Sequence, residues 1–141
     1  MAAVLKESNV KVIAGSASEV PWANCGPGIE IKVLAIDEKR HSVQYLARTG
    51  AGHNVGVHRN AADTNIYVLE GSIKNLTTGC EFGVGDFCFQ PDGDVHEELV
   101  GPQGVTTYVS QTGDSDVLVE FMDESGAVCD NFKLSDFAKL L

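Results

Sequence analysis

The sequence predicts an all-β protein, and three observations support this prediction. Apolar residues recur with strand periodicity in short runs that are rich in Val, Ile, Tyr and Phe. Gly, Pro, Asp and Asn separate these runs and supply favourable turn chemistry. The chain has 141 residues, the length of one ordinary domain. Because many short strands with close turns are typical of sandwiches and barrels, we expect one such domain over residues 1–141.

The alternating runs also place the individual elements. The predicted strands are Val10–Ala14, Ile29–Ile36, Ser42–Arg48, Gly56–His58, Ile66–Glu70, Ser72–Leu76, Glu81–Val84, Phe87–Gln90, Val95–Val100, Val105–Gln111 and Asp116–Met122. The tail differs, since Ser135 can cap a short C-terminal helix in which Phe137, Leu140 and Leu141 share one face. We expect that face to pack on the barrel or on a partner subunit.

Charge and composition exclude several classes of partner. The chain has 10 Lys and Arg against 20 Asp and Glu, a net charge of −10, and no basic cluster interrupts this acidity. Nucleic acid and anionic membrane surfaces would therefore be repelled. Lys6 and Glu7 interrupt the first residues where a signal peptide needs an apolar stretch, and no run has membrane-spanning length. We expect a cytoplasmic protein whose four scattered cysteines stay reduced.

Two segments carry polar residues at regular spacings. The first contains Gly52, His58, Asn60, Thr64 and Gly71, and the second contains Gly85, Pro91, Gly93 and His96. Alternate side chains of a strand share a face, so His58 and Asn60 project together, and a turn near Ala61–Asp63 would return Thr64 to the neighbouring strand. If His96 points inward, it faces His58. Imidazole is the commonest protein ligand for transition metals, so two facing imidazoles indicate a metal site.

These spacings resemble the two motifs of the cupin family, Gly-x5-His-x-His-x3,4-Glu-x6-Gly and Gly-x5-Pro-x-Gly-x2-His-x3-Asn. The resemblance implies a jelly-roll type β-barrel with the motifs at about 52–71 and 85–100. It also implies a divalent metal held by His58, His96 and Asn60. Asn60 stands where cupins usually have a second His, Thr64 where they usually have Glu, and Val100 where they have the final Asn. A neutral amide donates less electron density than imidazole, so we expect weaker metal binding.

A narrower resemblance covers nearly the whole chain. The segments that carry it are Val20-Pro21-Trp22, Gly28-Ile29-Glu30-Ile31-Lys32-Val33-Leu34, Tyr67-Val68-Leu69-Glu70-Gly71 and Gly85-Asp86-Phe87. They are similar to the cupin subgroup that includes 2,4'-dihydroxyacetophenone dioxygenase, acetylacetone dioxygenase and an anti-sigma-factor cupin domain. Members of that subgroup often lack the Glu and bind iron or zinc with three His. By this comparison Thr64 is a tolerable departure, and Asn60 is the serious one.

The sequence supports three hypotheses and leaves open whether the protein is an enzyme. The first is a mononuclear-metal, dioxygenase-like protein acting on a small carbonyl compound, with iron(II) as the metal and zinc, nickel or manganese as alternatives. The second is a non-catalytic small-molecule binding or sensing cupin with a degenerate metal site. The third is an isomerase, epimerase or lyase in which His58 or His96 transfers protons, but no distinctive pairing of a His with a carboxylate supports it.

Other residues are less informative about function. Glu98 shares a face with His96 and could be a ligand or a general base, but the acidic run Asp92–Glu98 favours a solvated carboxylate. His41 and His53 are interpreted as surface residues. Cys80 and Cys88 are interpreted as small core side chains. The resemblance implies a homodimer, for which the C-terminal helix face or the N-terminal strand could provide the contact.

Overall fold

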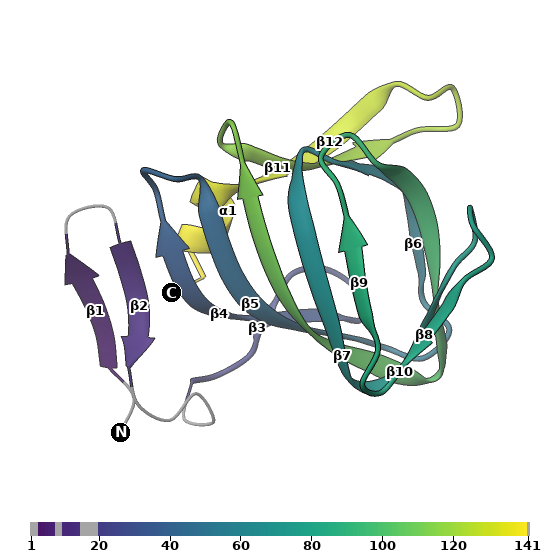
Figure 1. The fold of residues 1–141 in the computed structure, drawn as a ribbon, viewed down its shortest axis with the longest axis horizontal. Coiled ribbons are helices and arrows are strands. Elements are labelled where there is room, and N and C mark those ends of the chain that lie inside the picture. The colour runs from purple at the N-terminus through teal and green to yellow at the C-terminus, as the bar shows by residue number, and fades with distance from the viewer. Residues whose placement is uncertain (1–2, 8–9, 15–19, 141) are drawn as a thin grey trace.

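A curled antiparallel sheet forms most of the molecule. The computed structural model describes the backbone of residues 3–7, 10–14 and 20–140, and side chains over 20–140. Figure 1 shows the strands curving round into a barrel, with one short helix at one end. The all-β prediction and the predicted C-terminal helix are therefore confirmed.

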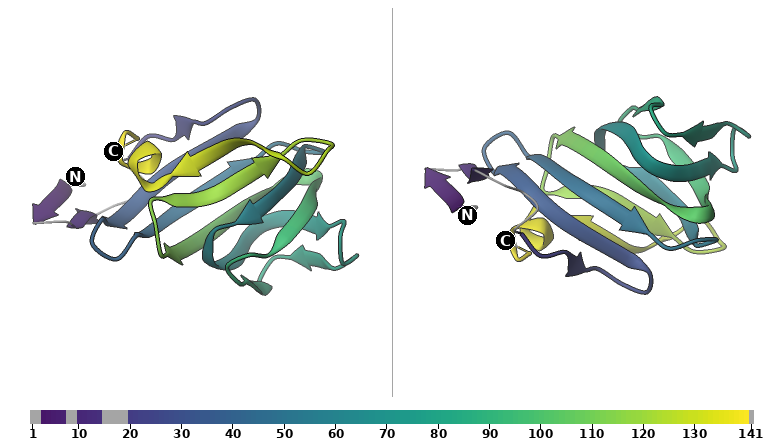
Figure 2. Two further views of the ribbon diagram at one scale, coloured as in Figure 1. Left: turned by 90° about the horizontal axis from the view of Figure 1, so that it is seen from above. Right: turned by 90° about the horizontal axis from the view of Figure 1, so that it is seen from below.

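The elements follow one another along nearly the whole described chain. They are β1 (Ala3–Glu7), β2 (Val10–Ala14), β3 (Ala23–Asn24), β4 (Ile29–Asp37), β5 (Ser42–Thr49), β6 (Asn54–Asn60), β7 (Ala62–Asn75), β8 (Glu81–Gly83), β9 (Phe87–Gln90), β10 (Val95–Gly113), β11 (Val117–Met122), β12 (Val128–Lys133) and α1 (Leu134–Ala138). The strand order is β1-β2-β4-β5-β10-β6-β11-β12, with β3 paired to β4 and β7 paired to β8, β9 and β10. Two further views show the β1–β2 hairpin extending from one end of the barrel (Figure 2).

Two long strands replace four of the predicted shorter ones. β7 continues through Gly71, and β10 continues through Gly101 and Pro102, where the sequence favoured turns. The pairing of β10 with β7 shifts its register between Val100 and Val105, so the Gly-Pro segment is an irregularity within a strand. β1, β3 and β12 were not predicted, and β12 is hidden from a pattern analysis because nearly all its side chains are exposed.

The helix packs against the barrel through Phe137. The ring centroid of this residue lies 4.7 Å from that of Tyr45 and 4.6 Å from that of Phe132. The helix begins at Leu134, with Lys133 at the N-cap, so the predicted Ser135 cap is wrong. The Ser135 hydroxyl instead donates to Asp116 Oδ2 at 3.1 Å.

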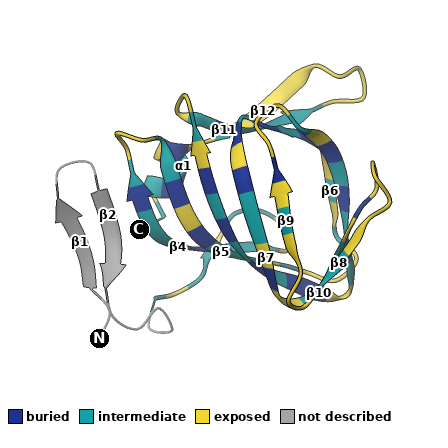
Figure 3. Cartoon of the chain, in the orientation of Figure 1, coloured by how far each residue is buried: buried dark blue, intermediate teal, exposed yellow. Residues whose placement is uncertain are grey.

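Buried and exposed side chains alternate along the strands, as Figure 3 shows. The larger buried apolar cluster joins β4, β5, β10 and β11 to the helix. Leu140 packs against this cluster, whereas Leu141 lies outside the described residues. Within the part of the chain that the structure describes, no helix is both long and apolar enough to cross a bilayer. Because side chains alternate between the two faces of a strand, every second residue of a strand faces the interior of the barrel.

The backbone conformation and the close approach of β10 require a glycine at position 71 of β7. Gly71 has a φ of +73°, and an added Cβ would overlap the carbonyl oxygen of Gly104. Gly79 has a similar φ of +80°, but nothing lies within 4 Å of its Cβ position. We predict that Gly71→Ala lowers the free energy of unfolding by about 2 kcal/mol more than Gly79→Ala, because it adds a steric clash to the same φ penalty. Urea denaturation of both variants measures the difference, and equal losses would contradict the predicted clash.

Candidate metal centre

His58 and His96 face each other across two paired strands. β6 and β10 are antiparallel neighbours, and His96 is the register partner of His58. Their ring centroids lie 4.3 Å apart in an edge-to-face arrangement. The side chains are buried, with 6% of His58 and 2% of His96 exposed. The structure therefore brings together the two histidines that the motif spacing singled out.

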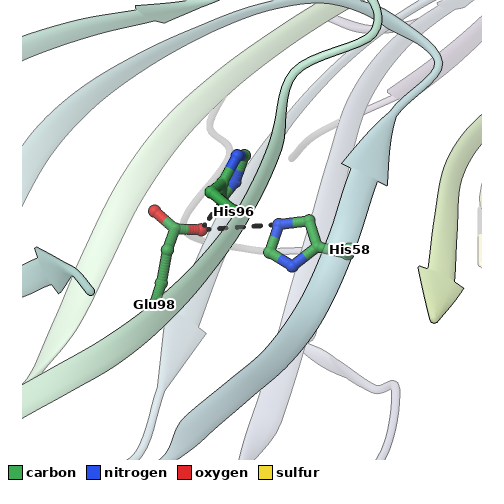
Figure 4. Close-up of side chains that lie close together, drawn as sticks. All are labelled: His58, His96 and Glu98. Carbon is green, nitrogen blue, oxygen red and sulfur yellow. Dashed lines mark ion pairs between the residues drawn. The ribbon is translucent and has the colours of Figure 1, made fainter. Parts of the chain in front are cut away.

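Glu98 joins the two histidines. It follows His96 by two residues, so both side chains lie on the inner face of β10. Glu98 Oε1 is 3.5 Å from His58 Nε2 and 3.3 Å from His96 Nε2. Figure 4 shows the carboxylate beside the two imidazole rings. One candidate ligand atom from each of the three residues lies within 4.8 Å of the others. Only 9% of Glu98 is exposed, so the sequence-based interpretation of a solvated carboxylate was wrong.

Hydrogen bonds to the other ring nitrogens orient both imidazoles. His58 Nδ1 lies 2.8 Å from the carbonyl oxygen of Gly56, and His96 Nδ1 lies 3.1 Å from Asp94 Oδ2. Because a carbonyl only accepts, Nδ1 of His58 carries the hydrogen, and the neutral ring presents a bare Nε2. His96 Nε2 is a buried nitrogen with no hydrogen-bond partner among the described residues. The two Nε2 atoms and the carboxylate therefore face a common point with donor atoms suited to a cation.

The electrostatics of the three groups favour an ionised carboxylate between the two imidazoles. Burial lowers the pKa of His58, and the Gly56 carbonyl and the Glu98 charge only partly offset it. Burial also acts to lower the pKa of His96, but Glu98 and Asp94 raise it above its ordinary value. Burial acts to raise the pKa of Glu98, but His96 and His58 lower it overall. The carboxylate thus stays ionised, so it can offset positive charge held by the imidazoles or by a metal ion.

Asn60 and Thr64 lie beside this cluster with other hydrogen-bond partners. Asn60 Nδ2 donates to Gln90 Oε1 at 2.8 Å, and Gln90 Nε2 lies 3.5 Å from Glu98 Oε2. Thr64 Oγ1 donates to the Ala62 carbonyl at 3.1 Å. β7, which carries Thr64, does not pair with β6, so the expected return to a neighbouring strand is wrong. Asn60 as a metal ligand stays a prediction.

The remaining singled-out residues are less closely tied to the site. His41 and His53 are half-buried and lie outside the cluster of three ligand candidates. Cys88 is half-buried, whereas Cys80 is exposed, so the interpretation of Cys80 as a core residue was wrong. Cys25, Cys80, Cys88 and Cys129 are all free thiols.

The cluster opens into a cavity of about 220 Å³ inside the barrel. Most of the lining side chains are apolar, and they include Phe121, whose ring centroid lies 6.0 Å from that of His58. His58, Asn60 and Glu98 contribute polar groups to the lining. A small apolar cavity with a few convergent polar groups is typical of a small-molecule site.

The hydrogen bond to Gly56 predicts which nitrogen of the His58 ring carries the hydrogen, and this can be tested. In the metal-free protein at neutral pH we expect the neutral Nδ1–H tautomer, since burial lowers the pKa of this residue. Long-range ¹H–¹⁵N spectra distinguish a protonated Nδ1 from a protonated Nε2, with half-buried His53 as an internal reference. A neutral His58 ring protonated at Nε2 would contradict the orientation described above.

Solved structures with the same fold include several cupins. An RmlC-like cupin protein from Ralstonia eutropha has a TM-score of 0.79 at 15% identity, covering 91% of this chain and 84% of that one. A putative acetylacetone dioxygenase from Methylibium petroleiphilum has a TM-score of 0.77 at 16% identity, covering 94% and 95%. An acetylacetone dioxygenase from Acinetobacter johnsonii has a TM-score of 0.70 at 14% identity, covering 99% and 83%. These similarities confirm the jelly-roll type cupin barrel.

Sequence comparison identifies the family. No curated protein sequence matches this chain. The family model of the ChrR cupin-like domain, however, matches residues 10–116, which include both motifs and all three ligand candidates. The chain therefore belongs to the ChrR cupin-like family.

Proposed function

We propose that this protein is a small metal-binding cupin of the dioxygenase type that acts on a small carbonyl compound. The observation that carries the proposal is the convergence of His58 Nε2, His96 Nε2 and Glu98 Oε1 at the wall of an apolar cavity. Two His and one carboxylate form the ligand set typical of non-haem iron(II) oxygenases. The fold shared with acetylacetone dioxygenases supports the same reaction class.

The residues of the site have distinct tasks in this proposal. His58, His96 and Glu98 would hold the ion, and Gly56 and Asp94 would keep the imidazole rings in the binding orientation. A bound divalent metal supplies Lewis acidity toward a carbonyl oxygen and, as iron(II), reactivity with dioxygen. The apolar lining would exclude water and accommodate the hydrocarbon part of the substrate. Iron(II) is the proposed metal, with zinc, nickel and manganese as the alternatives.

Metal binding is the first test of the proposal. We expect the protein to bind one divalent ion per chain and Glu98→Gln to weaken that binding about 100-fold or more, because it removes an anionic ligand. Glu97→Gln is the matched control, since Glu97 accepts from Asn54 Nδ2 at 3.0 Å and belongs to no candidate ligand cluster. Metal analysis and competition with a chelator measure both affinities. Equal metal affinities in the two variants would overturn the assignment of Glu98.

Asn60→Ala belongs in the same experiment, because the amide is the third ligand predicted from the sequence. A loss as large as that of Glu98→Gln would make Asn60 a ligand. A loss of about 10-fold is expected if Asn60 acts through Gln90 on Glu98.

Oxygen consumption tests the proposed reaction class. After anaerobic loading with iron(II), we expect substrate-dependent oxygen uptake with a member of a panel of β-diketones and hydroxyaryl ketones. His58→Ala should abolish it, since the variant lacks one of the three residues that form the candidate ligand cluster. The zinc-loaded protein provides a redox-inactive control. Full iron occupancy without uptake across the panel would count against a dioxygenase.

A specific observation also favours the second candidate, a non-catalytic binding or sensing module. Asn60 and Thr64 occupy two ligand positions of the family motif, yet both form hydrogen bonds inside the barrel that need no metal. Such bonds can maintain the pocket after a metal has been lost. Stoichiometric metal that is absent from His58→Ala and His96→Ala proteins would exclude the metal-free version of this candidate.

A further inference from the structure

A second group of buried polar side chains lies on the wall of the same cavity. Gln111 on β10 is the register partner of Thr64 on β7, and Thr64 is the partner of Gln90 on β9. All three side chains are buried and line the cavity. Neighbouring strands are about 4.8 Å apart, so this row places the backbone of Gln111 about 10 Å from that of Gln90. Gln90 lies next to Glu98, and Gln111 marks the far end of the row.

Two hydrogen bonds hold the amide of Gln111 in one orientation. The hydroxyl of Tyr45 donates to Gln111 Oε1 at 3.0 Å, and Gln111 Nε2 donates to Thr64 Oγ1 at 3.2 Å. Burial raises the pKa of Tyr45, so the phenol remains a hydrogen donor. The amide nitrogen has two hydrogens, and Thr64 is its acceptor among the described residues. The second hydrogen has no acceptor among the described residues, and the side chain that carries it lines the cavity.

The charges in the cavity restrict what that molecule can be. No Lys or Arg occurs among the described residues that line it, and Glu98 is the carboxylate in the lining. An anionic group at the Gln111 end would be buried without a counter-charge, which is costly. A hydroxyl or carbonyl oxygen would accept from Gln111 without that cost.

We propose that Gln111, positioned by Tyr45 and Thr64, is a second binding point for an uncharged oxygen of the ligand. The other end of the same ligand would bind at the centre formed by His58, His96 and Glu98. This inference rests on the proposed function, since it requires a ligand anchored at that centre. It narrows the ligand class to neutral compounds with two separated oxygen functions on a largely apolar body.

Three chelators that differ only at the far end test this assignment. Benzohydroxamate, 4-hydroxybenzohydroxamate and 4-carboxybenzohydroxamate share one metal-binding group, and calorimetric titration of the zinc-loaded protein measures their affinities. We expect the 4-hydroxy compound to bind roughly 3- to 10-fold more tightly than the parent, the contribution of one neutral hydrogen bond. The 4-carboxy compound should bind more weakly than the parent.

Variants of the protein test whether Gln111 is responsible for the tighter binding of the 4-hydroxy compound. In Gln111→Met the affinity ratio between the 4-hydroxy compound and the parent should fall to about one. Gln44→Met is the matched control, because Gln44 is exposed on β5 and accepts from the hydroxyl of Tyr108. It should keep the wild-type ratio. Should Gln111→Met not fold, Tyr45→Phe replaces it, and the ratio should again fall because the amide loses its orienting donor.

The outcomes separate this inference from the proposed function. Binding of the parent with an unchanged ratio in Gln111→Met would overturn the second binding point alone. A 4-carboxy compound that binds as tightly as the 4-hydroxy compound would overturn the restriction to neutral groups. Absence of zinc binding would overturn the metal centre and this inference with it. A zinc-loaded protein that binds none of the three hydroxamates would overturn this inference and leave the metal centre standing.

Discussion

The pairing of β10 with three other strands is the constraint on which the site depends. Its first part pairs with β6 and β7, and the pairing with β6 sets His96 opposite His58. Its last part pairs with β5 and β7. His96 and Glu98 are at even positions and Gln111 is at an odd one, so a regular pleat would place them on opposite faces of β10. All three are buried because the inward positions change from even to odd across the irregularity between Val100 and Val105. A slip of one residue in its register would turn these side chains toward the other face of the sheet. The irregularity between Val100 and Val105 connects the two parts while the strand continues.

Burial of Glu98 is costly, and its surroundings show how the fold compensates. A buried carboxylate needs partners with positive charge or hydrogen-bond donors. Two imidazoles flank one oxygen, and the Gln90 amide lies 3.5 Å from the other. Asn60 holds that amide through its own hydrogen bond. The polar groups around the carboxylate therefore form one connected network, in which a change at Asn60 can alter the position of Glu98 without contacting it.

Much of the architecture could be predicted because strand periodicity and turn residues act locally. The spacing of His58 and His96 within two motifs correctly predicted that they face each other. The long strands β7 and β10 were divided because Gly71 and the Gly101-Pro102 pair have turn chemistry, whereas strand pairing across these residues depends on distant partners. Local sequence could not show that pairing.

The position of Glu98 could be derived from parity, but its burial could not. Two residues separate it from His96, so a shared face was evident, yet the neighbouring acidic residues favoured a solvated side chain. Glu98 is buried partly because His58, which belongs to another strand, lies against its carboxylate. Likewise, the hydrogen bonds of Thr64 and Asn60 join residues far apart in the chain, which spacing within one motif cannot predict.

The candidate ligand set differs from the family motif in the strand that supplies its carboxylate. The motif places Glu at the position of Thr64, after the connection that follows β6, whereas this chain has Glu98 on the strand that already carries His96. Two of the three candidate donors are therefore spaced by the pleat of one strand. With the carboxylate on β10, Thr64 is free to pair with Gln111. The position where the motif has Glu is therefore occupied here by a residue that belongs to the polar far wall.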